Sequence, residues 1–186
     1  MLSILIPTYN YNVFPLAENL FNQCKKAGID YEIIVFDDGS SNQFDNYQIN
    51  SLENCFFKVL EKNIGRSAIR NLLSKTAKFD WLLFLDSDVF PKGKDLIRDY
   101  LNEIYKNSVP RIIYGRIRYQ EEAPEKIQLL RWIYGNKREA TSVFERIKKP
   151  YLSFLTLNFL IHKSVFEKVR FNEEIPNLRN EDLLFS

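Results

Sequence analysis

The sequence predicts a single α/β domain in which helices flank a mostly parallel central sheet. Short apolar runs that suit buried strands alternate with amphipathic segments of helical period through residues 1–110. Several of these runs end abruptly in polar side chains, which is typical of strands at the ligand-binding edge of an open α/β sheet. With 186 residues, of which 45% are hydrophobic, the chain can bury one core, and a single domain is expected.

The first predicted unit is a strand, a helix and a second strand. Residues 2–6 form the first strand, which stops at Pro7, and a helix that begins with a proline then ends at Gly28. The second strand, residues 31–36, stops at a turn formed by residues 37–40. Because a β-α-β unit is almost always right-handed and parallel, the loop after Pro7 and this turn are expected to be neighbours.

A third strand, residues 56–60, precedes a helix that carries Arg66 and Arg70 near its start. Residues four apart share a helix face, and a helix N-terminus favours anions, so one interpretation is a diphosphate site. A solvated arginine pair on an exposed turn explains the same spacing equally well. Both interpretations stay open at this point.

The apolar run of residues 81–85 is expected to be a strand buried on both faces. It ends in Asp86, Ser87 and Asp88. Two carboxylates held side by side repel each other unless a cation lies between them, and a hard divalent cation carried by a phosphate ligand would meet that need. Another amphipathic helix follows, over residues 96–105.

The pattern changes after residue 110, where a smaller antiparallel part is expected. Residues 111–119 predict a half-exposed strand, residues 151–161 a returning strand, and residues 163–169 a short helix. Between the two strands, residues 126–149 hold the one local excess of basic side chains. Three interpretations suit this segment: an ordinary solvated helix and loop, a mobile flap over a charged substrate, and a patch for anionic membrane lipid.

Composition argues against several functional classes. A net charge of +2 gives no general case for nucleic acid as a partner. Cys24 and Cys55 lack metal-ligand spacing, so buried free thiols are expected instead of a disulfide framework or a structural zinc site. The N-terminus does not match a signal peptide, and no apolar run is long enough to cross a bilayer. We therefore expect a cytoplasmic domain, either free or at the inner face of the membrane.

Five short motifs follow one another in an order that is more specific than any one of them. They are residues 4–10, 34–40, 63–71, 84–88 and the late pair Glu181 and Asp182. Together they resemble family 2 of the inverting glycosyltransferases, which have the Rossmann-like GT-A fold, over essentially the whole chain. The resemblance implies a nucleotide-sugar-binding half over residues 1–110 and an acceptor-side half over residues 111–186 that is C-terminally truncated.

The activity implied by this resemblance is metal-dependent transfer of a sugar with inversion. The donor would be a nucleoside-diphosphate sugar, with a UDP-sugar favoured, and the acceptor a hydroxyl of a saccharide or a lipid-linked saccharide, in polysaccharide or glycan synthesis. The donor-binding residues carried over from the motifs are Pro7, Thr8, Tyr9, Asp38, Asn63, Arg66, Arg70, Asp86 and Ser87.

The resemblance also implies individual roles. Asp38 would accept a hydrogen bond from a base N–H, with Asp37 supporting the turn, and Asp86 would contact the ribose or the metal. The two arginines would face the base or the diphosphate, or support the loop. Asp88 would ligate Mn²⁺ or Mg²⁺ bridging the diphosphate. Asp182 would take the proton from the acceptor hydroxyl as that oxygen attacks the anomeric carbon.

Other functions remain alternatives. A non-catalytic sugar-nucleotide-binding module would keep the donor residues and lack a working acceptor side. A phosphotransferase of the haloacid dehalogenase type fits the spacing of Asp86 and Asp88, but it expects that pair after the first strand and a threonine where Phe90 stands. A nicotinamide enzyme fits less well, because Pro7 follows the first strand instead of a glycine-rich loop. The single histidine, His162, is interpreted as structural.

Overall fold

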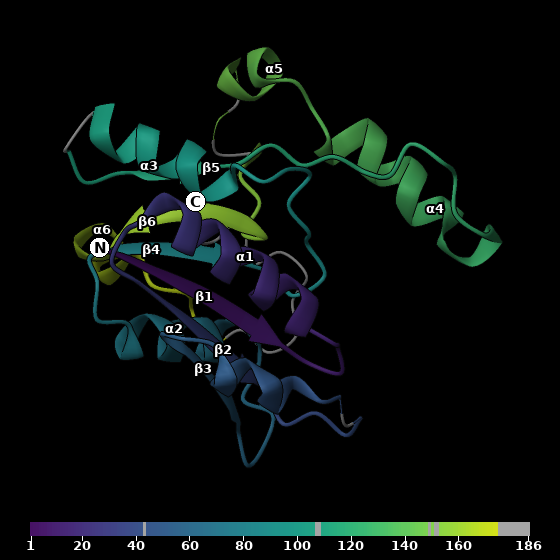
Figure 1. Ribbon diagram of the computed structural model, residues 1–186. Helices are drawn as coiled ribbons and strands as arrows, with labels where there is room; N and C mark the ends of the chain where they lie inside the picture. Colours follow the sequence, from purple (N-terminus) through teal and green to yellow (C-terminus); the bar gives the residue numbers. More distant parts are fainter. Residues whose placement is uncertain (43, 107–108, 149, 151–152, 175–186) are drawn as a thin grey trace.

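The structure, a computed structural model, describes residues 1–42, 44–106, 109–148, 150 and 153–174. In these ranges the chain forms a six-stranded sheet in the order β3-β2-β1-β4-β6-β5, with helices on both faces (Figure 1). The strands are β1 (Leu2–Thr8), β2 (Tyr31–Asp37), β3 (Cys55–Val59), β4 (Trp81–Leu85), β5 (Ile112–Tyr114) and β6 (Asn158–His162). The first four strands are parallel, and β6 pairs antiparallel with both β4 and β5. The predicted fold class, with its antiparallel part in the second half, is therefore confirmed.

Two layers of helices cover the sheet. The helical elements are α1 (Phe14–Ala27), η1 (Asn46–Ser51), α2 (Arg66–Thr76), α3 (Leu96–Lys106), α4 (Lys126–Tyr134), η2 (Gly135–Glu139), α5 (Val143–Lys148) and α6 (Lys163–Val169). Helices α1 and α3 share one hydrophobic core with the sheet, and α2 and α6 share the other. All five residues of β4 are buried, as expected for a strand covered on both faces. Each fully buried leucine or phenylalanine there contributes roughly 1.5–3 kcal/mol.

The topology gathers polar side chains at one edge of the sheet. Thr8 at the end of β1 pairs with Asp37 at the end of β2, and β4 lies on the other side of β1. The helix that follows β1 packs on one face of the sheet, whereas α2, which precedes β4, packs on the other. Such a reversal between neighbouring strands opens a crevice at their carboxyl ends. The residues that follow β1, β2 and β4 therefore meet there.

The second half of the chain forms less sheet than predicted. The strand expected over residues 111–119 pairs with β6 only over Ile112–Tyr114. Gly115 follows it and still donates its N–H to the carbonyl of Asn158 at 3.0 Å, and a Cβ at this position would lie 2.2 Å from Nδ2 of Asn158 and 2.8 Å from the hydroxyl of Tyr100. The returning strand, expected over residues 151–161, begins at Asn158, and residues 151 and 152 lie outside the described ranges.

Two further expectations concern the cysteines and the membrane. Cys24 is buried and Cys55 is half-buried, and both are free thiols. Burial raises the pKa of each thiol to about 12, so neither is a reactive nucleophile near neutral pH. Among the helices of the described ranges, none has the length and apolar character needed to span a bilayer.

Candidate functional site

A cleft of about 330 Å³ lies where β1, β2 and β4 end. Its walls come from the loops after these strands and from the first turns of α2. The lining residues are Pro7, Thr8, Tyr9, Tyr11, Asp38, Arg66, Ile69, Arg70, Asp86, Ser87 and Asp88. Most of the residues that the motifs singled out, far apart in the sequence, thus line one cavity. A larger cavity of about 580 Å³ lies near Gly28 and Tyr31, at the opposite edge of the sheet, and has none of them in its lining.

The turn after β2 is hydrogen-bonded to the loop after β1 and to the loop before α2. Oδ1 of Asp37 accepts a hydrogen bond from the Ser40 N–H at 2.8 Å, as expected for a residue that supports the turn. Asp38 is buried, and its two carboxylate oxygens accept from the N–H groups of Ile64 at 2.7 Å and Gly65 at 3.0 Å. Asp38 therefore holds the loop in front of α2, a contact that the sequence analysis did not anticipate.

Gly39 makes that loop approach the turn closely. Its φ is +73°, a conformation that side chains disfavour, and a Cβ there would lie 2.9 Å from the backbone N of Asn63. The side chain of Asn63 is exposed and does not line the cleft. The structure thus places the backbone of Asn63 beside the site and its side chain outside it.

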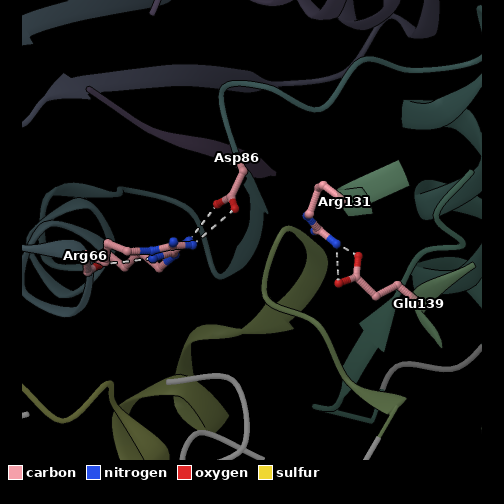
Figure 2. Close-up of polar contacts among 5 residues, drawn as sticks. Arg66, Asp86, Arg131 and Glu139 are labelled. Carbon is pink, nitrogen blue, oxygen red and sulfur yellow. Dashed lines mark hydrogen bonds and ion pairs between the residues drawn. The ribbon is translucent and has the colours of Figure 1, made fainter. Parts of the chain in front are cut away.

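The two arginines of α2 differ in their surroundings. Arg70 has only 2% of its side chain exposed, and its guanidinium donates to Oδ1 of Asp86 at 2.6 Å. Arg66 is 65% exposed, and its guanidinium lies 3.6 Å from Oδ2 of the same carboxylate (Figure 2). The interpretation of both as a solvated pair is wrong for Arg70. The charge of Asp86 is compensated from two sides.

Asp88 lies two residues further on, and its negative charge is less well balanced by nearby positive groups than that of Asp86. Burial of its carboxylate, and then the neighbouring charge of Asp86, raise the pKa of Asp88 above its usual value, although Arg66 and Arg131 act in the opposite direction. The ionised form is therefore disfavoured unless a positive charge arrives. A hard cation would supply that charge, so the chemistry of this carboxylate fits a divalent metal.

A metal at this position would need ligands besides the protein. Within the described residues, no three His, Cys, Asp or Glu side chains converge closely enough to hold an ion. Mg²⁺ and similar ions commonly combine one or two carboxylates with substrate phosphates and water, and that arrangement suits a single carboxylate in an open cleft. Asp182, the predicted base, lies outside the described residues, as does its neighbour Glu181.

Two buried polar atoms of the cleft residues have no hydrogen-bond partner in the described part of the chain. These are Oγ1 of Thr8 and Nε of Arg70. Buried polar groups are nearly always paired, so such atoms beside a cavity mark positions where a bound ligand or water can form hydrogen bonds. His162, by contrast, pairs with Trp81 at the start of β4 and its Nδ1 accepts from the Ser164 N–H, so it is structural as predicted.

Some residues near the cleft carried no signal in the sequence. Glu139 accepts two hydrogen bonds from Arg131, at 2.7 and 3.0 Å, and a third from the hydroxyl of Tyr119. Figure 2 shows Arg131 and Glu139 on the opposite side of Asp86 from Arg66. Arg131 comes from α4, Glu139 from η2 and Tyr119 from the loop before α4, and only the basic excess of the segment pointed to this part of the chain.

Comparison with known proteins agrees with this geometry. A family model described as glycosyl transferase family 2 matches residues 3–170. Chondroitin synthase from Escherichia coli is 40% identical over 95 residues, which cover 48% of this chain and 14% of that protein. An uncharacterized glycosyltransferase from Haemophilus influenzae is 38% identical over 90 residues, or 47% of this chain and 29% of its own length. The chain therefore spans less than a third of either relative.

Solved structures share the fold. TarS 1–349 from S. aureus in complex with UDP-GlcNAc superposes with a TM-score of 0.63 at 22% identity, covering 99% of this chain and 51% of that one. The mannosyltransferase PcManGT from Pyrobaculum calidifontis, in complex with GDP-Man and Mn²⁺, gives a TM-score of 0.59 at 14% identity, covering 94% of this chain and 48% of that one. This chain thus has about half the length of each.

Proposed function

This chain belongs to glycosyl transferase family 2, and from that premise we propose that it is the catalytic domain of a metal-dependent inverting glycosyltransferase. It would move a sugar from a nucleoside-diphosphate donor to a hydroxyl of a saccharide or lipid-linked saccharide. Residues 1–110 would form the donor side and residues 111–186 the acceptor side. The observation that carries the proposal is the cleft after β1, β2 and β4, where Asp88 has no ion pair among the described residues and Arg66 and Arg70 pair with Asp86 beside it.

The nucleoside would bind against the first loop. Tyr9 is exposed at the cleft and offers an aromatic face, and the unpaired hydroxyl of Thr8 offers a hydrogen bond. Each oxygen of Asp38 already accepts one backbone N–H, and its second lone pair can accept a base N–H, which would favour uracil. UDP is the first candidate nucleotide, since TarS was solved with UDP-GlcNAc, and GDP is the second, since PcManGT was solved with GDP-Man.

The diphosphate would lie between Arg66 and Asp88. Arg66 is exposed and can turn toward a phosphate, whereas Arg70 is buried and holds Asp86 in place. Asp86 and Ser87 would then face the ribose, and Asp88 would hold Mn²⁺ or Mg²⁺ together with phosphate oxygens. When bound, the cation would stabilise the negative charge that develops on the leaving diphosphate.

Asp182 is our candidate base. A carboxylate that removes the proton from the acceptor hydroxyl strengthens it as a nucleophile. Attack from the face opposite the nucleotide forms the new bond from the acceptor oxygen to the anomeric carbon as the bond to the diphosphate breaks, which inverts the configuration.

Calorimetric titration with UDP and GDP, with and without Mn²⁺, tests the donor site. The wild-type chain should bind one of them in a metal-dependent way, and Asp88→Asn should weaken that binding at least about tenfold, since a charged ligand contact is worth more than 1.4 kcal/mol. Asp80→Asn is the matched control, because Asp80 precedes β4 at the opposite end of the strand. Absence of nucleotide binding would rule out the donor site, and wild-type binding in Asp88→Asn would rule out the metal assignment.

Asp182→Asn separates catalysis from binding. Transfer should be abolished while the affinity for the donor stays nearly unchanged, because the base contacts the acceptor. If Asp182→Asn lost both transfer activity and donor affinity, the assignment of Asp182 as base would be contradicted. Donor binding without transfer or Asp182-dependent hydrolysis would point instead to a non-catalytic sugar-nucleotide-binding module.

A further inference from the structure

The segment of residues 126–148, which contains α4 and α5, projects from the body of the protein and exposes apolar side chains (Figure 1). Neither α4 nor α5 has a buried residue. On α4, Ile127, Leu130 and Tyr134 follow at intervals of three and four, so they share one face, and Ile127 and Leu130 are 94% and 79% exposed. Exposed apolar groups that cluster in this way usually mark an interaction surface.

Helix α5 repeats the pattern. Val143, Phe144 and Ile147 are all exposed, and they lie at spacings of one, three and four residues on a single short helix. With Ile133 on α4, seven large exposed apolar side chains thus lie within one segment of a chain whose sheet core is otherwise well covered.

Polar and aromatic contacts attach the segment to the body without using these side chains. Nε1 of Trp132 donates to the carbonyl of Gln120 at 2.8 Å, and Arg146 donates to the carbonyl of Gly115 at 3.0 Å. The guanidinium of Arg146 also lies 5.0 Å from the ring centroid of Tyr114. The apolar side chains are consequently held outward by a defined structure.

The charge of the segment is opposite to that of the rest of the chain. It contains six lysines and arginines against two glutamates, whereas the whole chain has a net charge of only +2, so the remainder is net negative. Lys126, Lys137, Arg138 and Lys148 are exposed basic residues of this segment. Basic residues that flank an exposed apolar face match the surface of an anionic membrane, where headgroup phosphates lie above acyl chains.

We propose that the segment 126–148 docks the protein onto a membrane leaflet that contains anionic lipid. Ile127, Leu130 and Phe144 enter the boundary between headgroups and acyl chains, and the lysines and arginines contact lipid phosphates. A second copy of this chain is a poorer occupant, since pairing the segment with itself would bring like charges together. A soluble polyanion would satisfy the charges but would leave the apolar side chains in water.

Docking of this kind would bring the donor cleft close to the bilayer. Arg131 belongs to α4, and Figure 2 shows it across from Asp86 of the cleft, so the docking segment adjoins the cleft. A lipid-linked acceptor would then reach the site from the membrane. This last consequence rests on the proposed function, whereas binding to the membrane does not.

Cosedimentation of the 186-residue chain with vesicles tests the proposal. One set of vesicles contains phosphatidylcholine alone, and the other an equimolar mixture with phosphatidylglycerol. The chain should bind the mixed vesicles, and added salt should weaken the binding. Ile127→Glu/Leu130→Glu should lower the affinity at least about tenfold, because it puts charges on the inserted face. Absence of binding to the mixed vesicles would overturn the proposal.

Matched variants separate this surface from general effects. Tyr105→Glu places a charge at an exposed aromatic position of α3 outside the segment and should leave binding unchanged. Lys137→Glu/Arg138→Glu should lower affinity at least about tenfold, while Lys26→Glu/Lys75→Glu, with the same change in net charge, should not. Equal losses of vesicle affinity in these two pairs of charge-reversing substitutions would overturn the proposal.

Two remaining outcomes identify other occupants. Vesicle binding that needs Lys137 and Arg138 but survives Ile127→Glu/Leu130→Glu would indicate a general polyanion site and contradict insertion. A dimer that Ile127→Glu disrupts, seen by sedimentation in the absence of vesicle binding, would indicate a second copy. All substituted residues lie outside the cleft lining, so each variant should bind UDP as the wild type does. UDP titration of each variant therefore tests the donor site separately from membrane binding.

Discussion

Asp86 and Asp88 are separated by one residue, yet they meet different surroundings. Asp86 accepts a hydrogen bond from the buried guanidinium of Arg70, and Arg66 lies 3.6 Å away on its other oxygen. Asp88 has no comparable ion pair among the described residues, and its pKa is raised by burial and by Asp86. A cation would therefore gain more at Asp88 than at Asp86, which is the physical basis for proposing Asp88 as the metal ligand.

The ion pair between Arg70 and Asp86 should make a large contribution to stability. Arg70→Met leaves a half-buried carboxylate without its main partner, and we expect the free energy of unfolding to fall by about 2–4 kcal/mol. Arg66→Met is the control, because exposed ion pairs contribute under about 1 kcal/mol. Urea denaturation measures both variants, and equal losses would contradict the difference in burial.

Asp88 should lower the stability of the metal-free protein at neutral pH. A carboxyl group whose pKa is raised on folding destabilises the folded state above that pKa, and the penalty disappears as pH falls below the pKa of the unfolded chain. With EDTA present, Asp88→Asn should therefore have a higher free energy of unfolding than wild type at pH 7. The gain should shrink as the solution is acidified.

Urea denaturation of wild type and Asp88→Asn between neutral and acidic pH provides the measurement. Asp80→Asn controls for the substitution itself, since it changes an exposed aspartate at the far end of the same strand. A difference between wild type and Asp88→Asn that does not depend on pH would show that the raised pKa is not the cause.

At the level of elements, two loops form the floor of the cleft by holding each other. The turn after β2 supplies the carboxylate of Asp38, and the loop before α2 supplies the N–H groups of Ile64 and Gly65. A second contact involves the first loop, where the Asn10 N–H donates to Oγ of Ser40 at 2.6 Å. These hydrogen bonds from backbone N–H groups to side chains hold all three loops in place before any ligand arrives, which lowers the entropy cost of binding.

Gly39→Ala should disrupt this arrangement more than an ordinary glycine substitution. At Gly39 the φ of +73° costs a side chain about 1–2 kcal/mol, and the added Cβ also meets backbone atoms of the next loop at 2.9 Å. We expect a total loss above about 2 kcal/mol, together with weaker UDP binding. Urea denaturation and calorimetry measure the two effects.

Gly28→Ala is the matched control for Gly39. Its φ of +63° is similar, but no atom lies within 4 Å of the added Cβ, so only the conformational cost of about 1–2 kcal/mol remains. If Gly39→Ala and Gly28→Ala lower the free energy of unfolding equally and UDP binding is unchanged, the close approach of the two loops at Gly39 contributes neither to stability nor to binding.

Prediction of the elements succeeded best where the pattern was local. The strands of the first half are within one or two residues of their predicted ends, because the apolar runs and the turn residues after them lie in the segments themselves, although β1 continues through the predicted stop at Pro7 to Thr8. The second half was harder, since the length of β5 depends on its pairing with β6, which is far away in the sequence. Such contacts join residues that are distant in sequence.

For the whole molecule, the structure predicts unequal local stability. Strands β1 and β4 lie between two buried cores, whereas α4 and α5 contain no buried residue. Amides of α4 and α5 should therefore exchange with solvent through local opening, and those of β1 and β4 only through global unfolding. Hydrogen exchange followed by mass spectrometry measures this, and uniform exchange across both regions would contradict it.

The candidate site shows how far sequence reasoning extended at this scale. The motifs selected Pro7, Thr8, Asp38 and Asp88 from three separate segments, and all four line one cleft. The burial of Arg70 was not visible, because it lies on a helix face whose inner side depends on how α2 packs against the sheet. The cluster of Arg131, Glu139 and Tyr119 was not visible either, since its members meet only through the fold of the second half.

The α/β class, most strand positions in the first half and the residue types available for a nucleotide site follow from the order of residues, because periodicity, turn residues and motif order are local properties of a chain. The strand order, the pairing of Asp86 with two arginines and the exposure of the apolar faces of α4 and α5 follow from tertiary packing. These features depend on which distant segments pack together, and packing decides which charges are neutralised and which side chains remain in contact with water.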